Sequence, residues 1–93
     1  MLYLVSYDLK RPEKDYPALF AALSQLGAEK VLLSEWFVIS DAAPDVIVNS
    51  LTAAGGFDGN DRVLVTELRQ NAAWNNTLLS TARVQEWYAH ARP

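Results

Sequence analysis

The spacing of hydrophobic positions divides the chain into alternating strands and helices. Residues 2–9 consist mainly of β-branched, aromatic and aliphatic residues without helical spacing, so we predict a first strand there. Residues 15–27 carry Leu19, Leu23 and Leu26 at intervals of three and four and end on a glycine. That pattern predicts an amphipathic helix of about three turns.

Signals at the helix ends set the expected boundaries. Asp15 precedes the first helix, where its carboxylate is placed to accept hydrogen bonds from the first free backbone N–H groups. A second helix is predicted over residues 41–56, which end on two glycines. Its start lies at Asp41 or Ala43, ahead of Pro44 in the first turn.

The remaining segments predict further strands. Residues 29–40, "EKVLLSEWFVIS", are too rich in β-branched and aromatic residues for a surface helix. They divide near Ser34 and Glu35 into two short antiparallel strands, or form one strongly bulged strand. Residues 57–61, "FDGND", predict a turn-rich loop, and residues 62–68 predict the last strand.

The order strand, helix, strand, strand, helix, strand is that of a ferredoxin-like βαββαβ plait. We therefore predict an α+β fold with a four-stranded antiparallel sheet and two helices on one face. Residues 75–93 lack strand alternation and predict a third helix or helical tail. The expected organisation is a ferredoxin-like domain over residues 1–70, with a C-terminal helical extension packing on the same domain or on its dimer partner.

Both faces of the predicted sheet are largely apolar. In the first strand, alternate residues form two rows: Tyr3, Val5, Tyr7 and Leu9 on one side, and Leu2, Leu4, Ser6 and Asp8 on the other. Two helices cover only one face, so the other must be covered by the C-terminal segment, by a second copy of the chain, or by both. We favour a homodimer packed sheet to sheet. The expected interface residues are Leu2, Leu4, Trp36 and Leu64.

Composition restricts the function classes. The 93-residue chain has no cysteine, which excludes disulfides, thiolate metal sites and cysteine nucleophiles. Its net charge of −3 disfavours broad nucleic-acid binding, because such binding depends on neutralising phosphates. The first apolar run is interrupted by polar residues and matches neither a signal peptide nor a membrane span. We expect a cytoplasmic protein without membrane contact.

Asp8 is the candidate for chemistry, because it ends the first strand just before a basic turn. Mg²⁺ and Mn²⁺ prefer hard oxygen ligands such as carboxylates, and a two-fold axis would bring two copies of Asp8 together. Ser6, Lys10 and Arg11 are placed to contact substrate phosphate beside it. The alternative is that Asp8 only accepts hydrogen bonds from N–H groups of the following loop.

Residues 2–9, "LYLVSYDL", and residues 32–40, "LLSEWFVIS", resemble the CRISPR-associated protein 2 family. They resemble more closely its bacterial relatives of unknown role encoded outside CRISPR loci. The resemblance implies the same plait, a dimer packed through its sheets, and a role for Asp8 in holding the metal in nuclease members. Ser34 and Trp36 or Phe37 fall at the family's serine-to-phenylalanine step.

The chain also departs from that family. Its first helix carries no basic residue for duplex contact, and a helical tail stands in place of the family's fifth strand. Two hypotheses follow. The first is a weak Mg²⁺- or Mn²⁺-dependent endonuclease acting on RNA or DNA, and the second is a non-enzymatic dimeric module that binds a protein partner through its acidic helical surface. The acidic balance favours the second.

Overall fold

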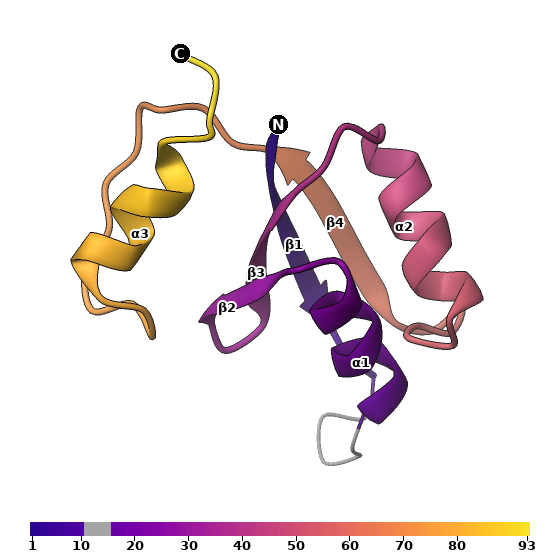
Figure 1. Cartoon of the computed structure of the whole chain (residues 1–93). Coiled ribbons are helices and arrows are strands. Elements are labelled where there is room, and N and C mark those ends of the chain that lie inside the picture. The colour runs from indigo at the N-terminus through magenta and orange to yellow at the C-terminus, as the bar shows by residue number, and fades with distance from the viewer. Residues whose placement is uncertain (11–15) are drawn as a thin grey trace.

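The computed structural model describes residues 1–10 and 16–93 and confirms the predicted α+β fold. Its elements, drawn in Figure 1, are β1 (Leu2–Asp8), α1 (Pro17–Gln25), β2 (Glu29–Leu32), β3 (Glu35–Ile39), α2 (Pro44–Ala53), β4 (Arg62–Glu67) and α3 (Thr81–Tyr88). The four strands form one antiparallel sheet in the order β2-β3-β1-β4. This arrangement is consistent with the ferredoxin-like plait, in which each helix connects two strands of the sheet.

The helix starts differ in detail from the sequence prediction. Both α1 and α2 begin with a proline, whose fixed φ suits the first turn. The N-cap of α2 is Ala43 and has no side-chain cap, so Asp41 does not cap this helix. The N-cap of α1 is Tyr16, and the predicted cap Asp15 lies outside the described residues. Gly27 follows α1 with a φ of 75°, a left-handed conformation that a helix end commonly requires.

The segment between the two helices combines both predicted alternatives. It forms two antiparallel strands, β2 and β3, joined at Leu33 and Ser34. The pairing also shifts register between Lys30 and Leu32, as at a β-bulge.

Strand register shows which side chains share a face of the sheet. Val5 of β1 pairs with Trp36 of β3, whereas Leu4 pairs with Phe37. Because paired residues point to the same side, Trp36 lies on the face of Val5 and Phe37 lies on the face of Leu4. The prediction that Trp36 shares a face with Leu4 is therefore corrected, and Phe37 occupies that place.

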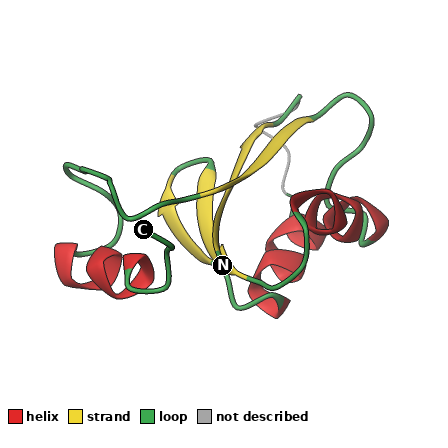
Figure 2. Ribbon diagram, turned by 90° about the horizontal axis from the view of Figure 1, so that it is seen from above, coloured by secondary structure: helices red, strands yellow, loops and turns green. Residues whose placement is uncertain are grey.

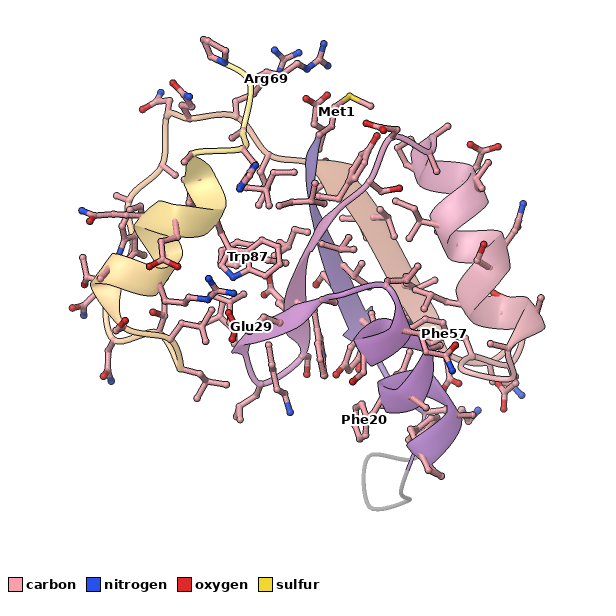
Figure 3. All side chains as sticks on the ribbon, viewed as in Figure 1. Met1, Phe20, Glu29, Phe57, Arg69 and Trp87 are labelled. Carbon is pink, nitrogen blue, oxygen red and sulfur yellow. The ribbon has the colours of Figure 1, made fainter. Side chains whose placement is uncertain are left out.

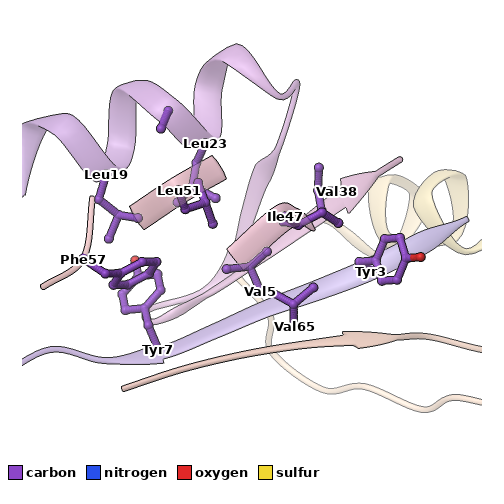
Figure 4. Close-up of a cluster of buried hydrophobic side chains, with 11 residues drawn as sticks. Tyr3, Val5, Tyr7, Leu19, Leu23, Val38, Ile47, Leu51, Phe57 and Val65 are labelled. Atoms are coloured by element: carbon purple, nitrogen blue, oxygen red, sulfur yellow. The ribbon is translucent and has the colours of Figure 1, made fainter. Parts of the chain in front are cut away.

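The helix-side face of the sheet packs against α1 and α2, which lie on one side of it in Figure 2. Figure 4 shows the resulting core. Its buried members are Tyr3, Val5, Tyr7, Leu19, Ala22, Leu23, Val38, Ile47, Leu51, Phe57 and Val65. Polar groups within this layer are paired: the Trp36 indole N–H donates to the Tyr7 hydroxyl at 2.9 Å, and the Tyr3 hydroxyl donates to the Ala42 carbonyl at 2.9 Å.

The opposite face, here called the tail-side face, is partly covered by the C-terminal tail, residues 71–93. The helix α3 lies across the sheet from α1 and α2 (Figure 2). Its start is capped by Ser80, whose hydroxyl accepts a hydrogen bond from the backbone N–H of Arg83 at 3.1 Å. The buried members of this second cluster are Leu2, Val31, Phe37, Val84, Trp87 and Ala91. The C-terminal segment thus covers part of the second face within a single chain.

Polar contacts hold the tail at both edge strands of the sheet, β2 and β4. Glu29 of β2 accepts hydrogen bonds from Arg83 Nε at 2.6 Å and from Trp87 Nε1 at 2.8 Å, and Figure 3 shows Glu29 facing Trp87. Near the C-terminus, the guanidinium of Arg92 donates two hydrogen bonds to the Glu67 carboxylate. Both carboxyl groups have a pKa below the ordinary value, that of Glu29 mainly through Trp87 and that of Glu67 mainly through Arg92.

Candidate functional site

The tail leaves one end of the tail-side face open to solvent. This open half is formed by Ser6 and Asp8 at the end of β1 and by Arg62 and Leu64 of β4. They line a shallow hollow of about 210 Å³. Leu64 is 62% exposed, although it lies on the same face as the fully buried Leu2. The open half is therefore a place where an apolar side chain and two charges face water together.

Asp8 is held in an ion pair with Arg62. The two residues are partners in the β1–β4 register, and Arg62 Nη1 donates to Asp8 Oδ2 at 3.0 Å. Both side chains are well exposed, 71% for Asp8 and 84% for Arg62, so water screens their attraction. The carboxylate is consequently accessible, but it already has a cationic partner.

A single chain offers little for a divalent cation at this position. Among residues 1–10 and 16–93, no three histidine, cysteine or acidic side chains gather as they would around a metal ion. Hard cations are usually held by one or two carboxylates with water and substrate phosphate. Asp8 would need a second carboxylate from another copy of the chain, and its Oδ2 already accepts a hydrogen bond from Arg62.

The other residues predicted to contact substrate do not all lie beside Asp8. Ser6 lines the same hollow as Asp8. The backbone N–H of Lys10 donates to Asp61 Oδ1 at 2.8 Å, and Lys10 itself is exposed. Arg11 lies outside the described residues. The structure therefore brings Ser6 and Asp8 together and adds Arg62, which sequence reasoning did not place beside Asp8.

The role of loop organiser, which the sequence left open for Asp8, belongs to Asp61. Its carboxylate accepts hydrogen bonds from the backbone N–H groups of Lys10 and Asp58 and from the Tyr16 hydroxyl. These contacts tie the loop after β1 to the turn before β4. Asp8, in contrast, points its carboxylate across the sheet to Arg62.

The four predicted interface residues have different surroundings. Leu2 is fully buried beneath the tail, Leu4 is half-buried, and Leu64 is exposed on the open half. Trp36 lies on the helix-side face, where its ring stacks on Phe20 with centroids 6.0 Å apart. A dimer formed through the tail-side face with the tail in place would use Leu64 and would exclude Leu2 and Trp36.

The fold and the site together define a ferredoxin-like α+β domain whose second sheet face is half covered by its own C-terminal helix. Comparison with protein-family models, with curated proteins and with solved structures found no match. Within the part of the chain that the structure describes, no helix has the length and apolar character needed to cross a membrane.

Proposed function

We propose that the protein is a homodimeric interaction module without catalytic activity, whose two copies associate through the open half of the tail-side face. The observation that carries this proposal is Leu64, an aliphatic side chain 62% exposed in the middle of a strand. Contact with a second copy would remove this apolar surface from water.

The charges beside Leu64 are suited to self-association. A two-fold axis makes the same patch face itself, so each residue of one copy meets residues of the other in a reciprocal way. The open half carries one acid, Asp8, and one base, Arg62, on adjacent strands. An axis placed so that Asp8 of one copy faces Arg62 of the other would let the two copies exchange these ion pairs across the interface.

A protein partner fits the outer surface of the helices better than nucleic acid does. No residue of α1 is charged, and α2 carries a single charge, the acid Asp45. A surface of this kind has no lysine or arginine to neutralise phosphates, which supply most of the binding energy for nucleic acids. We accordingly place the partner of the module on this surface.

Sedimentation velocity tests the dimer. We expect the wild-type chain to sediment as a dimer and the Leu64→Gln variant to shift to monomer at the same concentration. Val46→Gln is the matched control, because Val46 is an aliphatic residue 48% exposed on α2, across the sheet. A monomeric wild type, or equal dimerisation of both variants, would contradict the proposal.

A second candidate function is a weak Mg²⁺- or Mn²⁺-dependent endonuclease, in keeping with the resemblance to the CRISPR-associated protein 2 family. The observation that favours it is the exposure of Asp8 beside the same patch, since a two-fold axis there would bring two copies of Asp8 close together. This function requires metal-dependent cleavage of RNA or DNA that is lost in Asp8→Asn.

A further inference from the structure

A second hollow lies between the sheet and the tail and shares no lining residue with the hollow beside Asp8 and Arg62. It has a volume of about 140 Å³ and is lined by residues of β1, β2 and β3 together with residues of the tail. Most of its lining is apolar, including Leu4, Val31 and Val84. A cavity of ~150 Å³ is large enough to hold a benzene molecule, so the hollow can admit a group of six or seven heavy atoms.

Three aromatic residues line this hollow: Phe37 from β3, and Trp74 and Tyr88 from the tail. The rings of Trp74 and Tyr88 are nearly parallel, with centroids 5.6 Å apart and an interplanar angle of 5°. Phe37 meets Tyr88 edge-on at 5.7 Å and 82°. Two of the three rings are therefore stacked in parallel, and the third stands nearly perpendicular to Tyr88.

One carboxylate also lines the hollow. Glu35 is half-buried and lies two residues before Phe37 on the same face of β3. Over the residues that the structure describes, its side chain has no hydrogen-bond or ion-pair partner, in contrast to the paired Glu29 and Glu67. A half-buried carboxylate without a cation favours the entry of one, because the surrounding apolar groups screen its charge poorly.

We propose that this hollow is a binding site for an alkylated ammonium group, such as a trimethylammonium or dimethylammonium head. Ammonium groups are attracted to the faces of aromatic rings when they lie within about 6 Å of the ring centroid. Their methyl groups are apolar and suit contact with Leu4 and Val84. The carboxylate of Glu35 supplies the opposite charge.

Other ligand classes fit the hollow less well. An anion would be repelled by Glu35, and no lysine, arginine or histidine lines the hollow within the described part of the chain. A bare divalent cation would find only one carboxylate among apolar and aromatic groups, whereas such ions need several oxygen ligands. A neutral apolar molecule would fill the space but leave Glu35 unpaired.

Isothermal titration of the full chain with choline and with 3,3-dimethylbutan-1-ol tests the proposal. These probes have nearly the same shape, and only choline is charged. We expect choline to bind at least about tenfold more tightly than the neutral alcohol, because only the cation gains from the rings and from Glu35. Equal affinity for the two probes, or no binding of choline at millimolar concentration, would overturn the proposal.

Two substitutions test whether choline binds in this hollow. Glu35→Gln keeps the shape of the side chain, and we expect it to weaken choline binding at least about fivefold without lowering the melting temperature. Asp45→Asn removes the same charge from α2, on the opposite face of the sheet, and is expected to leave binding unchanged. Equal losses in the two variants would mean that choline responds only to net charge and would overturn the assignment.

The same titration with Leu64→Gln separates this site from the proposed dimer. Leu64 does not line the hollow, so the variant changes the oligomeric state without altering the residues that would hold the cation. Choline binding by either form supports the site. If both forms fail to bind, the site is rejected whatever the sedimentation result.

Discussion

The two faces of the sheet are covered in different ways. Among the residues that the structure describes, eleven buried ones form the helix-side core and six form the cluster under the tail. The helices α1 and α2 each connect two strands, so the chain returns to the sheet on both sides of them. The tail follows the last strand, so only the contacts of its own residues hold it against the sheet. The helix-side layer is therefore an integral part of the fold, whereas the tail is a separately attached cover.

Charge distribution follows the same division. Five ion pairs form among the residues that the structure describes, and three of them involve Arg83 or Arg92 of the tail. The helix-side core instead uses neutral hydrogen bonds, such as that from Trp36 to Tyr7. Attachment of the tail should consequently respond to pH and salt, and the helix-side core should not.

The largest expected effect is in the helix-side core. Leu51 of α2 is fully buried, so Leu51→Ala leaves a cavity and should lower the free energy of unfolding by about 2–5 kcal/mol. Val46→Ala on the same helix should change it by less than about 1 kcal/mol, because Val46 is already 48% exposed. Urea denaturation of both variants measures the difference. Similar losses in the two would contradict the description of this core.

A change under the tail should act locally. Trp87 packs on Phe37 and donates to Glu29, so Trp87→Ala should detach the tail while the helix-side core stays folded. Amide hydrogen exchange should rise at least about tenfold in residues 81–91 and remain nearly unchanged in β1 and α1. Uniform loss of protection across the chain would show that the two layers unfold as one.

Acid should loosen the tail first. The pKa values of Glu29 and Glu67 are lowered by their partners, so their stabilisation is complete above the ordinary value of 4.5 and is lost as the pH falls through the lowered values. The indole N–H signal of Trp87 should therefore shift below pH 4.5 in an NMR titration.

Trp36 provides an internal control for that titration, because its indole N–H donates to a tyrosine hydroxyl rather than to a carboxylate. Its signal should stay in place over the same pH range. Glu29→Gln should reduce the response of Trp87. Simultaneous movement of both indole signals would indicate global unfolding and would contradict separate attachment of the tail.

The smallest expected effect concerns the ion pair on the open half. Asp8 and Arg62 are both mainly exposed, and pairs of this kind contribute about 0–1 kcal/mol. Asp8→Asn and Arg62→Gln should each lower stability by no more than this amount, and the double variant by about the same as either one. A loss above ~2 kcal/mol in thermal or urea denaturation would give the pair a larger structural role than its exposure allows.

Much of the fold follows from local signals along the chain. Pro17 and Pro44 start the helices and Gly27 follows the first. Leu19 and Leu23 mark the buried side of α1 as predicted, whereas Leu26 follows the helix and is 39% exposed. These signals act over a few residues, so a single sequence is enough to read them. The order of elements then limits the topology to a plait.

The face of Trp36 could not be predicted with equal success. Trp36 and Phe37 are adjacent aromatic residues, and a register shift in the neighbouring strand disturbs the alternation. Either residue would suit either apolar face. Only pairing with β1, which places Trp36 opposite Val5, decides between them.

The tail and the candidate site depend on contacts between distant segments. Glu29 and Arg83 are 54 positions apart, as are Asp8 and Arg62. The second pair had a usable signal, because Asp8 ends the first strand and Arg62 begins the last, and these strands are antiparallel neighbours in the plait. The tail had no such signal, since the plait itself does not define where a C-terminal helix lies.

A nuclease assay tests the central claim, that the open half serves association and not catalysis. Wild type and Asp8→Asn, purified in parallel, are incubated with single- and double-stranded RNA and DNA across a range of Mg²⁺ and Mn²⁺ concentrations. We predict that neither protein cleaves any substrate in a metal-dependent manner. Cleavage by the wild type that requires metal and disappears in Asp8→Asn would contradict this account and would identify Asp8 as a catalytic metal ligand.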